Sequence, residues 1–208
     1  MKSKTMKQNT TKLFLPFNSE WLVFWGGDTK LQNMHHHDNA SQKFAFDFGI
    51  IDAGGKSHKG DGKNNDDYYC FGREILSPAD GKVIEVINGV RDNKPGSLNP
   101  YSAVGNGVVI EHNRQEISVL AHLKLGSIKV KVRDKILAGQ PVGLCGNSGN
   151  SSEPHLHFHL QDTPVIQDGR GIKCFFQKVI VRKNVKQSLK EKKSPVKGEI
   201  ISSANNII

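Results

Sequence analysis

The chain has 208 residues, enough for one domain with additional length at its ends. Its composition, with 36% hydrophobic residues, 24% charged residues and 21 glycines, is typical of a turn-rich β protein and argues against a helical bundle. The net charge of +9 favours contact with polyanions, but an arginine-rich helix and RNA-type aromatic motifs are missing, so we expect no nucleic acid partner. No apolar run reaches the roughly 18 residues of a membrane span.

The two ends of the chain differ in composition from its middle. Residues 1–11 are polar and are predicted to form a flexible arm. They begin with basic residues but lack the apolar segment of a secretory signal, so the export route stays open and so does a cytoplasmic location. Residues 183–208 are rich in lysine and are predicted to form a basic flexible tail. The domain itself is expected to span residues 12–182.

Between these ends, short apolar runs alternate with turns and show no βαβ rhythm. The fold class predicted is mostly β, an antiparallel sheet or small barrel-like sandwich with long loops bordering a groove. Loops are expected at 52–69 and 88–106, and a hairpin is expected from 107–112 and 116–122. Cys70, Cys145 and Cys174 lie far apart in sequence and are expected to be buried free thiols.

The first polar residue that stands out is Asp47, in the alternating strand expected over residues 43–50. Its neighbours Phe44, Phe46 and Phe48 point to the opposite face of that strand. Because burying an unpaired carboxylate is costly, Asp47 should be ion-paired, hydrogen-bonded or bound to a metal. A run of three histidines, residues 35–37, precedes this strand and either supplies a ligand or forms a solvated loop.

The second polar feature is the run from His155 to Leu160, which follows a loop of small residues. If this run is a strand, His155, His157 and His159 share one face and the three apolar residues between them share the other. Imidazoles at fixed spacing on a rigid element are what zinc requires. The alternative is an amphipathic strand whose polar face carries histidines without a metal.

Together these features resemble the LytM/lysostaphin-type M23 family of zinc metallopeptidases. The resemblance covers residues 33–160 and rests on five segments in the family's order. These are QKFAFDFG (42–49), SPADGKV (77–83), GNGVVIEH (105–112), LAHL (120–123) and GLCGNSGNSSEPHLH (143–157).

The resemblance implies a site residue by residue. His157 and Asp47 match metal ligands, and His122 and His155 match the two catalytic histidines that do not bind the metal. The common family form places the first ligand four residues before the aspartate, where this chain has Lys43. We therefore predict an upstream ligand, His36, with His35 as the next choice. His159 is expected beside the ligands or at the groove wall.

Two imidazoles and one carboxylate leave the fourth position of Zn²⁺ open for water, as in a catalytic site. Bound Zn²⁺ lowers the pKa of that water to about 7, and a nearby histidine suits the proton transfer. The resemblance implies a zinc endopeptidase that hydrolyses peptidoglycan peptides, outside the cell or in its envelope, with anionic wall polymers as further partners. The alternatives are an inactive relative that binds the wall or activates a hydrolase, and, less favoured, a nucleic acid binder that uses the basic tail. Which peptide bond is cleaved is not readable from the sequence.

Overall fold

The computed structural model describes residues 7–36, 40–113 and 115–204. These residues form one large sheet, a small two-stranded sheet and two short 3-10 turns, and the described part contains no α-helix. None of its elements could span a membrane as an apolar helix. In spatial order, the large sheet runs β12 (Lys186–Lys193), β11 (Phe176–Lys183), β13 (Ile200–Ser203), β1 (Trp21–Trp25), β2 (Phe46–Gly49), β9 (Leu156–Gln161), β6 (Glu116–Leu123), β5 (Asn106–Asn113), β4 (Gly81–Ile87) and β7 (Lys135–Ile136).

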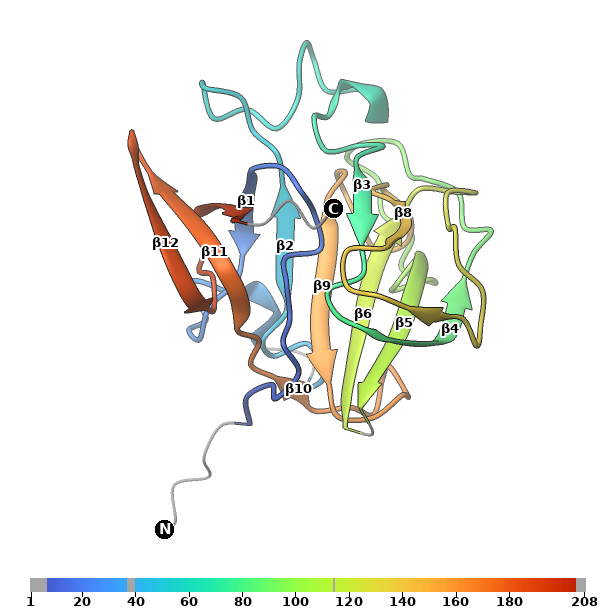
Figure 1. Ribbon diagram of the computed structural model, residues 1–208. Helices are drawn as coiled ribbons and strands as arrows, with labels where there is room; N and C mark the ends of the chain where they lie inside the picture. Colours follow the sequence, from blue (N-terminus) through green and yellow to red (C-terminus); the bar gives the residue numbers. More distant parts are fainter. Residues whose placement is uncertain (1–6, 37–39, 114, 205–208) are drawn as a thin grey trace.

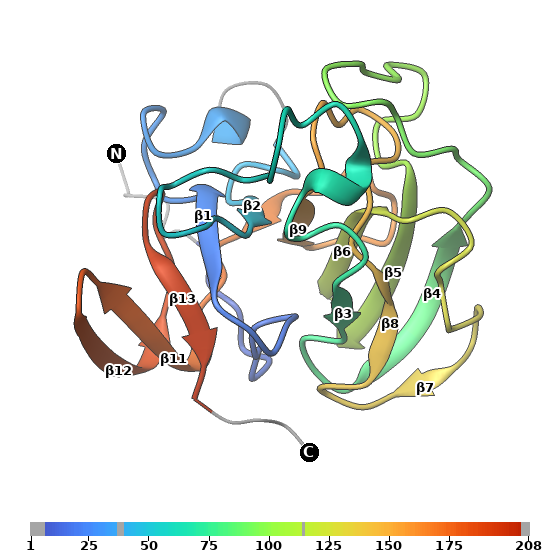
Figure 2. The same cartoon turned by 90° about the horizontal axis from the view of Figure 1, so that it is seen from above.

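The remaining elements are small. Strand β10 (Gly171–Ile172) pairs with β9, and β3 (Glu74–Leu76) pairs with β8 (Pro141–Leu144) in the second sheet. The 3-10 turns are η1 (Met34–His36) and η2 (Asn65–Asp67). All pairings between the named strands are antiparallel, which confirms the predicted fold class. Strand β9 runs through the middle of the molecule (Figure 1), and β12 and β7 lie on opposite sides of it (Figure 2).

The core forms on one face of the central strands. Phe46 and Phe48 of β2 stack on each other with ring centroids 5.4 Å apart, and Phe158 of β9 and Phe176 of β11 pack beside them. Leu156 and Leu160 are buried in the same cluster, so the predicted alternation along β9 is confirmed for its apolar side chains. The other face of β2 and β9 is thereby left for polar side chains.

The expected hairpin is also present, as β5 and β6, and the three cysteines are free and buried. The first apolar block, residues 13–25, contains one strand, β1, and before it Leu13 makes an isolated bridge to Phe176. Pro16 lies between these two segments and has no backbone N–H to donate to a ladder.

Residues 183–208 were predicted to form a flexible tail, but the structure contains two strands in this segment. Residues 186–193 form β12 along the edge of β11, and residues 200–203 form β13 between β11 and β1. The lysine-rich sequence obscured these strands because β12 is almost wholly exposed and has no apolar alternation. Residues 205–208 lie outside the described part.

The predicted N-terminal arm is corrected in the same way for residues 7–11; residues 1–6 lie outside the described part. Gln8 forms a parallel bridge with Lys173, and the backbone N–H groups of Thr10 and Thr11 donate to the carboxylate of Glu116 at 2.6 and 2.8 Å. Burial works to raise the pKa of Glu116, but the hydrogen bonds from Thr10 and Thr11 outweigh it and lower that pKa. The charged carboxylate therefore fixes this segment to β6.

Because β13 is part of the sheet, substitutions in it should destabilise the fold. Ile201 is fully buried between β1 and β11, opposite Trp21 and Val181. We expect Ile201→Ala to lower the free energy of unfolding by about 2–5 kcal/mol, measured by chemical denaturation. Leu189→Ala in β12, a matched control at a side chain that is 53% exposed, should stay within about 0.5 kcal/mol of the parent. Equal, small effects of both substitutions would show that residues beyond 183 do not contribute to folding.

Candidate metal centre and catalytic histidines

Three neighbouring strands bring the polar residues of the site together. Asp47 in β2 lies directly opposite His157 in β9, and His157 lies opposite Ala121 in β6. Directly opposed residues on antiparallel strands have side chains on the same face, about 5 Å apart. The register of these strands thus places an aspartate and a histidine side by side, with His122 one residue further along β6.

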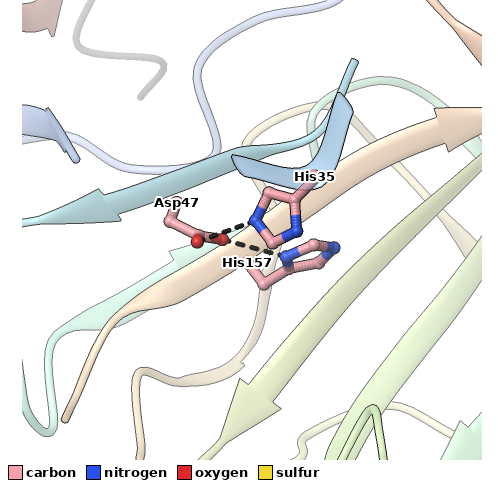
Figure 3. A group of neighbouring side chains, drawn as sticks. All are labelled: His35, Asp47 and His157. Atoms are coloured by element: carbon pink, nitrogen blue, oxygen red, sulfur yellow. Dashed lines mark hydrogen bonds and ion pairs between the residues drawn. The ribbon is translucent and has the colours of Figure 1, made fainter. Parts of the chain in front are cut away.

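Asp47 contacts two imidazoles at once (Figure 3). His157 Nδ1 lies 2.9 Å from Asp47 Oδ1, and His35 Nε2 lies 2.8 Å from Asp47 Oδ2. One ligand atom from each of the three residues lies within 4.8 Å of the other two. Two imidazole nitrogens and a carboxylate on rigid or anchored segments fit the ligands and spacing of a zinc site with an open position.

The structure places His35 against Asp47, whereas the sequence analysis preferred His36 as the upstream ligand. The buried side chain of Asn33 explains the difference. Its Oδ1 accepts from the backbone N–H of His35 at 3.0 Å, and its Nδ2 donates to the carbonyl of Ala45 at 3.0 Å. This Asx-type turn anchors η1 to the start of β2 and aims His35 at Asp47. The His36 ring instead lies against the segment before β2, with Nδ1 3.2 Å from the carbonyl of Lys43. His37 lies outside the described residues.

Burial and neighbouring charges shift the pKa values of Asp47 and His35 in opposite directions. Burial tends to raise the pKa of Asp47, but the charges of His35 and His155 and the close contacts with His157 and His35 hold that pKa well below its usual range. Burial opposes the charged form of His35, yet the charge and hydrogen bond of Asp47 outweigh it and raise the pKa of His35. Burial lowers the pKa of His157. Asp47 is therefore a carboxylate whose charge the site must compensate.

His122 and His155 lie together at the side of this group, with ring centroids 4.8 Å apart. His122 Nδ1 lies 2.8 Å from the carbonyl oxygen of Ser148, and His155 Nδ1 lies 2.9 Å from that of Glu153. A carbonyl oxygen can only accept, so each Nδ1 carries the proton. In the neutral ring, Nε2 is then free to accept a proton, and Nε2 of His155 lies 3.6 Å from Asp47 Oδ1. Burial, followed by repulsion from His155 and His157, holds the pKa of His122 well below its usual range.

A bulge in β6 aims His122 into the site. The register with β5 gains one residue between Leu120 and Leu123, and His122 adopts a positive φ of 61°. A bulge of this kind redirects one side chain, and a left-handed backbone at a residue other than glycine costs energy that the surroundings must supply. The backbone N–H of His122 donates to the carbonyl of Val104 at 3.0 Å, which holds the conformation.

Two glycine-containing loops meet behind His122. The Oγ of Ser148 donates to the carbonyl of Leu123 at 2.7 Å and accepts from the backbone N–H of Asn106 at 2.9 Å. Gly105, at a φ of +65°, lies against Ser148 so closely that a Cβ there would be 2.4 Å from its carbonyl carbon. The GNG segment at 105–107 and the GNSG segment at 146–149 thus hold the carbonyl that binds His122 Nδ1.

The group opens into a cavity of about 440 Å³. Side chains from His35, Asp47, His122, His155, His157 and His159 line it, so the structure brings together every predicted site residue except His36. Its other walls include Phe24 and Trp25 of β1 and Leu98, Ala103 and Val104 of the loop at 88–105. The loop at 52–69 supplies no lining residue, although Ser57 donates to Glu153 at 3.3 Å.

Reasoning from sequence missed several residues that shape this cavity. Asn33, Ser148 and Gln161 are fully buried polar residues, and Phe24 and Trp25 belong to an apolar block that looks like core. The one available signal was the Asn-x-His spacing before the histidine run, which is typical of an Asx turn.

Three comparisons place these features among known proteins. Residues 66–169 match the model of peptidase family M23. Peptidoglycan DD-endopeptidase ShyA of Vibrio cholerae is 35% identical over 90 residues, which are 43% of this chain and 18% of that protein. Murein hydrolase activator NlpD of Escherichia coli is 30% identical over 112 residues, which are 54% of this chain and 26% of that protein. The crystal structure of a zinc-containing peptidase from Vibrio cholerae aligns over 78% of this chain and 39% of its own, at 21% identity and a TM-score of 0.48.

The chain spans less than a third of the length of the curated relatives it matches. The family match includes His122, His155 and His157, whereas His35 and Asp47 precede it. It covers half of the 208 residues. The protein therefore belongs to peptidase family M23.

Proposed function

We propose that this chain is a zinc-dependent endopeptidase that hydrolyses peptide bonds in peptidoglycan, outside the cell or in its envelope. One observation carries the proposal: His35, Asp47 and His157 converge within 4.8 Å, beside His122 and His155 in the same cavity. The match to ShyA, whose name describes peptidoglycan endopeptidase activity, supports the substrate class.

The residues of the chain would divide the work as follows. His35, Asp47 and His157 would hold Zn²⁺, which supplies a polarised carbonyl and a more acidic water when bound. Peptide hydrolysis also needs one group to accept a proton from water and one to give a proton to the departing amine. His122 and His155 suit these tasks, because both line the cavity and carbonyl oxygens hold their Nδ1 protons, which leaves Nε2 available to accept or give a proton. The apolar walls at Phe24, Trp25 and Leu98 would bind the peptide and exclude water.

The second candidate is a wall-binding or hydrolase-activating protein without peptidase activity. The similarity to NlpD, whose name describes a murein hydrolase activator, is the observation that favours it. A site that retains two imidazoles and a carboxylate, with two further histidines beside them, favours the enzyme. Digestion experiments separate the two candidates.

The basic C-terminal hairpin, defined as β11 and β12, is the region best suited to bind anionic wall polymers. Residues 176–193, which form the two strands and the turn between them, contain seven lysines and arginines and one acidic residue, Glu191. Strand β12 is exposed along its length, at the free edge of the sheet. Lys183 and Lys186 lie directly opposite each other across the hairpin, a like-charge pair that an anion would stabilise.

The choice between His35 and His36 gives a matched pair of variants. His35→Ala removes a ligand atom, so we expect zinc affinity to fall by at least 10-fold and peptidase activity to be lost. His36→Ala should leave both within about twofold, because its ring contacts only the segment before β2. Zinc content after dialysis against a weak chelator, together with wall lysis, measures both effects. Loss of zinc from the His36 variant and retention by the His35 variant would reverse the assignment.

The reaction itself is tested on purified cell walls of several chemotypes. The zinc-loaded chain should release new amino ends from at least one wall type, identified by mass analysis of the fragments. His122→Ala should abolish this release while zinc binding persists, because His122 is not one of the ligands. A zinc-loaded chain that releases no amino ends, but increases lysis by a separate hydrolase, would identify an activator.

The hairpin predicts salt-sensitive binding to walls. Replacing Lys183, Lys186 and Lys190 with glutamine should weaken cosedimentation with walls that carry anionic polymers, and most strongly at low ionic strength. The matched control carries the same loss of charge at the opposite edge of the sheet, at the exposed residues Lys82, Lys131 and Lys135. Equal loss of binding in both variants would show that net charge, and not the hairpin, is responsible.

A further inference from the structure

We propose that Gln161 and His159 are positioning residues that place the proton of His157 on Nε2, so that Nδ1 is offered to a divalent metal. The proposal rests on the metal site described under the proposed function, and it assigns to two further buried residues the task of preparing one ligand. It is carried by a chain of hydrogen bonds that begins at the protein backbone and ends at His157, beside Asp47.

The chain lies along one face of β9. His157 Nε2 is 3.0 Å from His159 Nδ1, and His159 Nε2 is 2.9 Å from Gln161 Oε1. The residues follow each other at every second position, so the pleat of the strand stacks their side chains in a row. All three are buried, with Gln161 at 0%, His159 at 1% and His157 at 4% exposure. Water is therefore a poor competitor for these bonds.

The direction of the protons follows from the far end of the row. Gln161 Nε2 donates to the carbonyl oxygens of Thr163 at 2.7 Å and Val165 at 3.0 Å. Because carbonyl oxygens only accept, the amide of Gln161 must point its NH₂ group at them and its Oε1 at His159. His159 Nε2 must then carry the proton, and in a neutral ring its Nδ1 has only a lone pair.

The same reasoning applies one step further along the row. Since His159 Nδ1 can only accept, His157 Nε2 must carry the proton of that ring. In a neutral ring, His157 Nδ1 then has a lone pair and no proton, and this atom is the one 2.9 Å from Asp47 Oδ1. Two acceptors at that separation repel each other unless a cation lies beside them both. The row therefore favours the binding of a cation at the point where the three proposed ligand atoms converge.

The alternative proton position shows why such a row is useful. A histidine beside a carboxylate with no other constraint favours a proton on the nitrogen that faces the carboxylate, because a charge-assisted hydrogen bond forms there. Such a bond between His157 Nδ1 and Asp47 would occupy both ligand atoms and compete with the metal. The hydrogen bonds that His159 Nδ1 accepts from His157 and that Gln161 Oε1 accepts from His159 oppose this state, so less free energy is lost when the metal binds Nδ1.

The packing around Gln161 supports a fixed orientation. Gly169 lies against the amide so closely that a Cβ at this position would be 2.8 Å from Gln161 Cδ. Substitution of Gly169 thus offers a way to displace the amide without removing any hydrogen-bonding group. This provides a second variant with an independent physical basis.

The test measures the position of the proton and the metal affinity separately, on the full chain. In the metal-free protein at mildly alkaline pH, nitrogen-15 NMR of the imidazoles should find the His157 proton on Nε2. Gln161→Met has a similar length but cannot accept or donate in this way, and it should move the proton toward Nδ1. Its zinc dissociation constant, measured by competition with a chromogenic chelator, should rise about 10-fold or more.

Two further variants control for a merely structural effect. His159→Gln can still accept from His157 and donate to Gln161, so we expect the proton to stay on Nε2 and zinc affinity to stay within about threefold. Gly169→Ala should behave like Gln161→Met, and it serves as the disrupting variant if Gln161→Met does not fold. Unchanged proton position and unchanged zinc affinity in the disrupting variants would overturn the proposal. A parent chain with the Nε2 proton but no zinc binding would instead refute the proposed function and leave the row intact.

Discussion

The antiparallel pairing of β2 with β9 is the constraint on which the rest of the site depends. It places Asp47 directly opposite His157, and the core side chains on the reverse face hold the two strands in that register. A slip of one residue would move either Asp47 or His157 into the phenylalanine cluster, where an unpaired charge or imidazole would be strongly unfavourable. The apolar packing that stabilises the sheet therefore also fixes the positions of the Asp47 and His157 side chains relative to each other.

The site joins rigid and irregular elements, and each has a distinct task. Strands β2 and β9 supply Asp47 and His157, the two proposed ligands whose separation is fixed by register. Irregular backbone positions two further histidines: an Asx turn aims His35 at Asp47, and a bulge with a positive φ aims His122 into the site. Both irregular segments are held by buried polar groups, Asn33 in one case and Ser148 in the other. Flexible loops would not keep four imidazoles around one carboxylate.

The sequence predicted those parts of the structure that depend on local periodicity. Alternation along 155–160 identified the strand and its two faces, and Asp47 stood out as a charge beside aromatic residues. Strand register was not accessible in this way, because cross-strand neighbours are set by long-range packing. The sequence could not decide whether His35 or His36 reaches Asp47, because adjacent histidines in a turn have no periodicity. In the structure, a hydrogen bond from the backbone N–H of His35 to the side chain of Asn33 places His35 there. Strands β12 and β13 were missed because lysines at an exposed edge carry no apolar signal.

The row from Gln161 to His157 extends this logic from positions of atoms to positions of protons. A strand fixes where an imidazole lies, but either of its nitrogens can carry the proton, and only one arrangement leaves Nδ1 free for a metal. Backbone carbonyls have no such ambiguity, since they accept and never donate. The carbonyls of Thr163 and Val165 fix the orientation of the Gln161 amide. That orientation sets the proton position of His159, which in turn sets the proton position of His157. The proton positions of His122 and His155 are set directly by the carbonyls of Ser148 and Glu153. Three of the histidines around Asp47 thus have their proton positions set by the peptide backbone, so the chemistry of the site depends on the fold as much as on the residues that line it.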